Sequence, residues 1–162
     1  MQVASLEPRD AAAVAELWLA GALESSAADS SFAPRQSPAE CAASVESDLA
    51  SGAYFGWGVF EASERHLFGY LTARVEKPSE VFTRSKSLYL LDLDVRPSAR
   101  RQGLATSLVA TARRHAESCE IERIEVGWLS ADPTASAFWR TQGFSEYLVR
   151  GHLTLRRGAH GA

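Results

Sequence analysis

The segment from Lys86 to Leu129 constrains the fold more than any other part of the chain. An apolar run rich in strand-forming residues, Lys86–Val95 (KSLYLLDLDV), stops at Pro97. Leucines and alanines at helical spacing then predict a helix from about Gly103 to Ser118, and a further strand follows over Arg123–Leu129. Two strands joined through a helix are expected to be parallel, with a right-handed crossover. The segment therefore predicts an α/β protein.

The flanking segments add antiparallel strands and further helices. Further strands are expected at Gln2–Leu6, Tyr54–Ala62 and His66–Lys77, with a final hairpin of Phe144–Val149 and His152–Arg156. Further helices are expected after the N-cap Asp10, between the capping box Ser37–Glu40 and Gly52, and between Asp132-Pro133 and Gly143. The predicted order is β-α-α-β-β-β-α-β-α-β-β.

Length and composition bound the function classes. The 162 residues correspond to one domain that can bury a core without disulfides, and we expect it to span residues 1–157 with a flexible tail at 158–162. A net charge of −3 argues against nucleic acid as the main partner. Two distant cysteines favour a reduced, cytoplasmic setting. No apolar run predicts a membrane span, and the N-terminus does not resemble a signal peptide.

The loop Val95–Thr106 (VRPSARRQGLAT) joins the apolar strand to its helix. A helix N-terminus has unpaired N–H groups and a dipole that favours anions. Gly103 lets the backbone approach a ligand closely, and Arg96, Arg100 and Arg101 add positive charge. From the residues alone, two interpretations stay open: a phosphate or pyrophosphate cradle, and a solvated basic turn that caps a core helix. The P-loop and dinucleotide-binding glycine motifs are both absent.

Two blocks of the sequence resemble the GNAT superfamily of acyl-CoA N-acyltransferases. Arg100–Ala105 (RRQGLA) matches the signature Gln/Arg-x-x-Gly-x-Gly/Ala, and Asp132–Phe144 (DPTASAFWRTQGF) is similar to the second block of the family. The resemblance implies a twisted mixed sheet with two splayed parallel strands, about four flanking helices, and acyl-CoA in the gap. It also implies an enzyme that transfers an acetyl group from the co-substrate acetyl-CoA to a primary amine of a small molecule, peptide or protein.

The same resemblance implies which residues bind acetyl-CoA. The backbone of Leu93 and Val95 would pair with the pantetheine amides. Asp132 stands where relatives often have a cofactor-contacting Asn, and Trp139 stands where many have a Tyr general acid. Trp139 is therefore expected to pack on the pantetheine arm, since an indole N–H cannot act as an acid. The pyrophosphate loop would comprise Arg100, Arg101, Gln102, Gly103, Leu104, Ala105 and Thr106.

Acyl transfer from a thioester requires a deprotonated amine, a polarised carbonyl and a thiolate that leaves protonated. Strand alternation puts Asp92 and Asp94 on one face of their strand, where an apolar setting would raise their pKa and suit a catalytic base. The alternative is that one of them is a structural ion-pair partner. Relatives often have Glu where this chain has Leu91. Tyr89 and Tyr147 are candidate general acids, with core packing as the alternative for both.

The acceptor is expected to bind at the first two helices and the loop Asp29–Gln36, with Phe32, Trp18 and Tyr54 as wall residues and core packing as the alternative for Trp18. The four histidines and two cysteines have no metal-ligand spacing, so no metal is expected. Because the Glu and Tyr of relatives are missing, a second interpretation stays open: a module that binds CoA without catalysis, as a sensor or partner subunit. The sequence also leaves a homodimer open.

Overall fold

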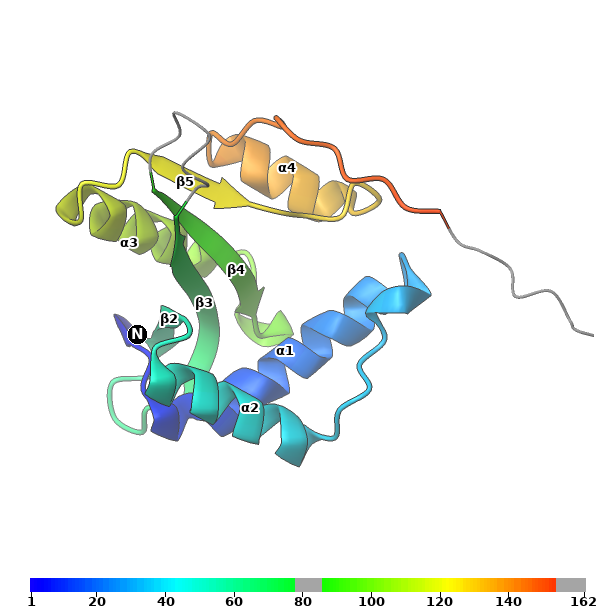
Figure 1. The fold of residues 1–162 in the computed structure, drawn as a ribbon. Coiled ribbons are helices and arrows are strands. Elements are labelled where there is room, and N and C mark those ends of the chain that lie inside the picture. The colour runs from blue at the N-terminus through cyan, green and yellow to red at the C-terminus, as the bar shows by residue number, and fades with distance from the viewer. Residues whose placement is uncertain (78–85, 154–162) are drawn as a thin grey trace, which may run out of the picture.

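The computed structural model describes residues 1–77 and 86–153, which form a five-stranded sheet with helices on both faces (Figure 1). The strands are β1 (Gln2–Ser5), β2 (Phe55–Phe60), β3 (Leu67–Glu76), β4 (Ser87–Val95) and β5 (Arg123–Val126). The helices are α1 (Ala11–Ser26), α2 (Pro38–Ser51), α3 (Leu104–Ser118) and α4 (Pro133–Thr141), with short 3-10 turns η1 (Pro8–Asp10), η2 (Ser30–Phe32) and η3 (Pro97–Ala99).

The sheet order follows the chain, β1-β2-β3-β4-β5. The first four strands are antiparallel neighbours, and β4 pairs with β5 in parallel, as expected for two strands joined through α3. The predicted α/β class with a mixed sheet and four helices is confirmed. In the described part of the chain, no helix combines the length and apolarity needed to cross a membrane.

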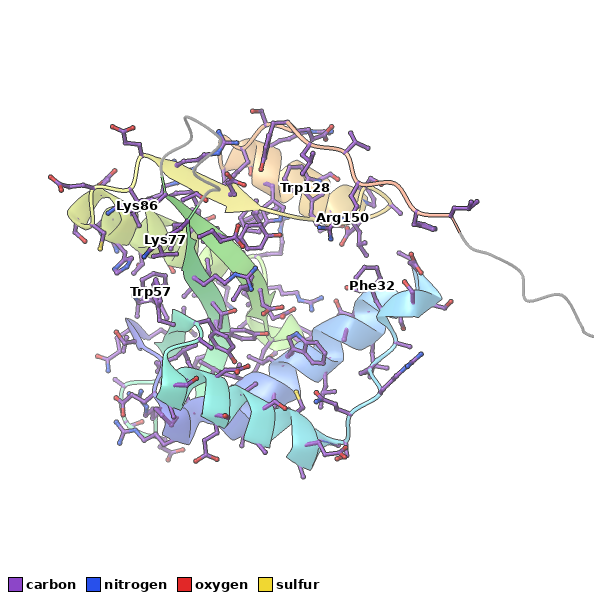
Figure 2. The ribbon with its side chains drawn as sticks, in the orientation of Figure 1. Phe32, Trp57, Lys77, Lys86, Trp128 and Arg150 are labelled. Carbon is purple, nitrogen blue, oxygen red and sulfur yellow. The ribbon has the colours of Figure 1, made fainter. Side chains whose placement is uncertain are left out.

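Two apolar clusters lie on opposite faces of the sheet. The α3-side core consists of Trp57, Val59, Leu71, Ala73, Leu88, Leu90, Leu108, Val109, Ala112, Ala116, Ile121 and Trp139. The α1-side core consists of Leu6, Ala11, Val14, Ala15, Leu17, Cys41, Val45, Phe60, Leu67 and Tyr70. Trp57, labelled in Figure 2, is only 8% exposed, so it is a core residue as expected.

The predicted capping interactions are present at both ends of α2, whereas at the start of α1 a tertiary ion pair takes the place of the cap. Ser37 and Glu40 form the predicted capping box at the start of α2, and Gly52 ends that helix in the left-handed conformation at φ 71°. Asp10 is at the predicted N-cap of α1, but its side chain does not cap the helix. Its carboxylate instead accepts hydrogen bonds from Arg65, whose Nε lies 2.8 Å from Asp10 Oδ1.

The pairing of β3 with β4 changes register near the middle of both strands. Thr72 is opposite Asp92, but the next residue of β3, Ala73, is opposite Leu90. Leu91 is therefore an extra residue in β4, and it has no partner in β3. Such a β-bulge bends the strand and shifts the alternation of the side chains that follow it.

The bulge decides which face of the sheet each side chain of β4 meets. Leu90, before the bulge, belongs to the α3-side core. Asp92 and Asp94, after it, accept hydrogen bonds from Trp18 of α1 and from Tyr70 in the α1-side core. The two carboxylates therefore share one face, as predicted, and that face is the one covered by α1.

The prediction of a C-terminal hairpin is wrong for the residues that the structure describes. Residues 144–153 contain no strand, and the apolar side chains from Tyr147 onward are exposed, from 55% for Tyr147 to 91% for Val149. The segment contacts β5 through a hydrogen bond from the Tyr147 hydroxyl to the Glu125 carboxylate, whereas a strand requires backbone pairing. Residues 154–156 of the expected second strand, and the expected tail at 158–162, lie outside the described residues.

Candidate active site

The parallel pairing of β4 with β5 ends at the bulge. The last matched pair is Leu90 with Val126, and residues 91–95 have no partner in β5. Figure 1 shows the chain that follows the end of β5 running away from β4. The β4 edge at 91–95, which includes Leu93 and Val95, therefore presents backbone groups to which an extended amide chain could bind as an added strand. One of those groups is already used, because the Val95 carbonyl accepts a hydrogen bond from Arg100 Nε at 3.0 Å.

The loop that the resemblance assigns to the pyrophosphate, Arg100–Thr106, follows the open edge along the chain and is called the cofactor loop below. The backbone N–H groups from Arg101 to Thr106 have no hydrogen-bond acceptor within residues 1–77 and 86–153, whereas that of Ser107 donates to the Gly103 carbonyl. Arg101 and Gly103 both adopt left-handed conformations, with φ of 64° and 78°. Such conformations turn successive N–H groups toward a common point, which suits an anion. A Cβ built on Gly103 meets no atom within 4 Å, so the space in front of the loop is open.

The arginines of the loop differ in what they contact. Arg96 forms an ion pair with Glu16 of α1 at 2.7 Å, and Arg100 forms one with Glu24 of the same helix at 2.8 Å. These pairs tie the loop to α1. Arg101 has no ion pair within the described chain, so it is the arginine of the three whose charge is left for a ligand.

Asp92 is held at the junction of the open edge and the α1 face. Its two carboxylate oxygens accept hydrogen bonds from Trp18 Nε1 at 3.2 Å and from Thr72 Oγ1 at 3.1 Å. Burial away from water raises the pKa of Asp92, and these two hydrogen bonds oppose the rise. A carboxylate with a raised pKa and no cation beside it is suited to take a proton from an amine.

Asp94 is packed more tightly than Asp92. It accepts a hydrogen bond from the Tyr70 hydroxyl at 3.0 Å, and a Cβ on Gly21 of α1 would lie only 2.3 Å from Asp94 Oδ1. The absence of a side chain at Gly21 is what lets α1 lie against this carboxylate. Burial, assisted by the nearby charge of Asp92, raises the pKa of Asp94 to about 6.

A raised pKa at Asp94 implies a specific pH dependence of stability. Between about pH 4 and pH 6 the folded protein holds a proton at Asp94 that the unfolded chain has released, so its contribution to the free energy of unfolding falls as pH rises. Asp94→Asn cannot ionise. From pH 4 to pH 7 the variant should gain on the order of 2 kcal/mol relative to wild type in urea unfolding. Glu46→Gln, at an exposed site, is the control, and a pH-independent difference for Asp94→Asn would contradict the assignment.

A cavity of about 180 Å³ opens beside Asp92, between the sheet and helices α1 and α2. Its wall includes Trp18 and Tyr54, two of the residues predicted to line an acceptor pocket, but neither Phe32 nor Asp94. Figure 2 shows Phe32 on the α1 side of the β4–β5 opening and Trp128 on the β5 side. The cavity is lined by Val14, Trp18, Gln36, Cys41, Ser44, Val45, Asp48, Tyr54, Tyr70, Thr72 and Asp92.

Several of these lining residues were not predicted. Asp48 had a detectable signal, since it lies seven residues beyond Cys41 and three beyond Val45, on the helical face that α2 buries. A carboxylate on an apolar stripe suggests a functional or paired group. Thr72 had no such signal, because its contact with Asp92 depends on the register of β3 against β4.

The second sequence block lies on the far side of the opening. The Asp132 carboxylate caps α4 by accepting from the N–H groups of Thr134 and Ala135 at 2.9 and 3.0 Å. Trp139 is 6% exposed and packs edge-to-face against Phe144 with ring centroids 5.2 Å apart, in the α3-side core. Thr106 of the cofactor loop accepts a hydrogen bond from Gln142 Nε2 at 3.4 Å, which links the two sequence blocks.

Residues 1–77 and 86–153 contain no group of three or more His, Cys, Asp or Glu side chains that could hold a metal ion. The described residues thus provide an anion-binding loop, an open strand edge and a buried carboxylate beside a cavity.

Comparisons with known proteins agree with this arrangement. Residues 22–144 match the family model described as the acetyltransferase (GNAT) family. No curated protein is similar enough in sequence to count as a match. Many solved structures are similar in fold, and three of them illustrate the range.

A tetramutant of the BH1408 protein from Bacillus halodurans has 14% identity and a TM-score of 0.85, over 96% of this chain and 100% of that one. An aminoglycoside 6'-N-acetyltransferase from Acinetobacter haemolyticus has 17% identity and a TM-score of 0.70, over 96% and 99%. A predicted acetyltransferase from Clostridium acetobutylicum, solved with acetyl-CoA, has 14% identity and a TM-score of 0.71, over 98% and 99%. These likenesses confirm the expected fold.

Proposed function

Because the chain belongs to the acetyltransferase (GNAT) family and is thus an acyl-CoA-dependent N-acyltransferase, we propose that it transfers an acetyl group from acetyl-CoA to the primary amine of a small molecule or peptide. The observation that carries the proposal is the succession of three features along the end of β4 and the loop that follows it. The open edge of β4, the N–H groups of the cofactor loop and the cavity at Asp92 follow one another within residues 91–106. The two free cysteines, Cys41 and Cys119, support a reducing, cytoplasmic setting.

The residues present fit acetyl-CoA at each part of its length. The backbone of Leu93 and Val95 would pair with the amides of pantetheine, apart from the Val95 carbonyl that Arg100 already holds. The N–H groups from Arg101 to Thr106 would bind the pyrophosphate, with the Arg101 guanidinium adding charge. Two residues would bound the acetyl-CoA site on the β5 side. Asp132 would do so by fixing the start of α4, and Trp139 by supporting that helix from the core. Bound acetyl-CoA would supply an acyl group already activated as a thioester.

Asp92 is the group we propose as the base. It lines the cavity, whereas Asp94 is outside the cavity wall and is held by Tyr70 against α1. The hydrogen bonds from Trp18 and Thr72 fix the Asp92 carboxylate in position and leave further lone pairs to accept a proton. As the amine nitrogen bonds to the acyl carbon and the carbon–sulfur bond breaks, Asp92 takes the proton from nitrogen, and the departing thiolate is protonated from solvent or by a tyrosine.

The test measures binding and chemistry separately. Acetyl-CoA should raise the melting temperature of the protein, and release of free thiol should depend on an added primary amine, in a panel of diamines, amino acids, aminoglycosides and peptides. A melting shift without thiol release for any amine would favour the CoA-binding module. No shift with acetyl-CoA at concentrations that saturate related folds would contradict the anion-binding assignment of the loop.

A further inference from the structure

The cavity beside Asp92 carries negative charge without any compensating cation. Its lining includes two carboxylates, Asp92 and Asp48, and no Lys, Arg or His among the residues that the structure describes. The two carboxylates approach the cavity from different elements, β4 and the last turns of α2. A neutral or anionic acceptor would leave this charge unbalanced, whereas a cationic acceptor would balance it.

The two carboxylates differ in what already holds them. Each carboxylate oxygen of Asp92 accepts a hydrogen bond, one from Trp18 and the other from Thr72. The Asp48 side chain forms no hydrogen bond or ion pair with any residue of the described chain, although it is half-buried in the cavity wall. The charges of Asp48 and Asp92 both act on the Tyr54 hydroxyl, so both carboxylates lie near this one side chain. Asp48 is thus a second, separate position for a cation.

The size and walls of the cavity limit the rest of the acceptor. A volume of about 180 Å³ is close to that of cavities that enclose a single benzene-sized molecule, and it is below the range for drug-sized ligands. The aromatic side chains of Trp18, Tyr54 and Tyr70 form part of its wall. Aromatic faces suit both an alkyl chain and an ammonium group.

We propose that the acceptor is a small aliphatic diamine, with one amine placed at Asp92 for acetylation and the other, still protonated, bound by Asp48. This inference rests on the proposed function, because it specifies the acceptor of the same site. An α-amino acid is disfavoured, since its carboxylate would enter a cavity that already holds two. A lysine side chain of a peptide would reach Asp92 but would bring no second ammonium group to Asp48.

The experiment compares 1,4-diaminobutane with butylamine, a monoamine of matched length, in wild type, Asp48→Asn and Glu46→Gln. The expected wild-type kcat/KM is roughly ten-fold or more higher for the diamine, because only the diamine forms the ion pair with Asp48. Asp48→Asn should remove most of the advantage of the diamine, lowering kcat/KM for the diamine at least several-fold more than it lowers kcat/KM for butylamine. Glu46→Gln, an exposed carboxylate on the same helix outside the cavity wall, should change neither.

A second readout does not depend on turnover. In titration calorimetry, 1,4-diaminobutane should bind wild type and Glu46→Gln, and bind Asp48→Asn at least several-fold more weakly. Equal kcat/KM for the two amines, or a lysine peptide as the better acceptor, would overturn the diamine assignment while leaving acetyl transfer intact. If no amine is acetylated but diamine binding still depends on Asp48, the proposed function fails and the diamine site stands. If binding does not depend on Asp48, the site itself is refuted.

Discussion

Substituting Asp92 by Asn is expected to lower kcat for acetyl transfer by roughly 100-fold or more, with the affinity for acetyl-CoA little changed. The substitution keeps the size of the side chain and removes its ability to accept a proton. An Asn at this position can still accept from Trp18 and can donate its amide to the Thr72 hydroxyl, so the local hydrogen bonds survive. Steady-state kinetics together with acetyl-CoA binding measure the two effects.

The pH profile adds a signature that a structural role would not produce. Because the base must be ionised, wild-type kcat/KM should fall as pH drops through the pKa of Asp92, which burial has raised above its ordinary value. Asp92→Asn should flatten this acidic limb. Asp94→Asn is the matched control, with the same chemical change two residues away on the same face of β4. Near-normal turnover of Asp92→Asn across pH would leave positioning as the main source of rate.

The second large effect is expected at the cofactor loop. Gly103→Glu should abolish acetyl-CoA binding, since the new carboxylate would occupy the anion position in front of the unpaired N–H groups. A side chain at φ 78° also strains the backbone, at a cost of about 1–2 kcal/mol, which the fold should tolerate. The melting shift with acetyl-CoA reports binding, and circular dichroism reports folding.

Gly52→Glu is a control that distinguishes the effect of backbone strain from the loss of the anion-binding position. Gly52 also has a left-handed φ, 71°, and open space around its Cβ position, but it ends α2, away from the loop. Both variants should lose a similar amount of thermal stability, and Gly103→Glu alone should lose the response to acetyl-CoA. An unchanged acetyl-CoA affinity in Gly103→Glu would refute the loop assignment.

The sequence predicted most of this fold because its signals are local. The capping box at Ser37, the left-handed Gly52 and the cap at Asp132 each depend on residues within a few positions of one another, and all three are present. The apolar β4 segment and the helical spacing of α3 likewise predicted a parallel pair correctly. The predicted C-terminal hairpin is absent from residues 144–153, because a strand requires that a neighbouring strand pair with its backbone.

The site was predictable in part, for the same reason. The loop from Arg101 to Thr106 could be predicted from its glycine and its position before a helix. The pairing of Arg100 with Glu24 could not, because it joins residues that are far apart in the chain. The bulge at Leu91 also left no mark in the sequence, so the side of the sheet that Asp92 faces could be known only from the register of β3 against β4.

That extra residue in β4 has a consequence for how such a site is gained or lost during evolution. Deleting one residue between Leu90 and Asp92 would restore the regular alternation and turn both carboxylates toward the apolar side chains beneath α3. The offset depends on the number of residues in β4 and not on the side chain at position 91. Point substitutions can change the chemistry of this site, but the face of the sheet on which its carboxylates lie depends on the number of residues in β4.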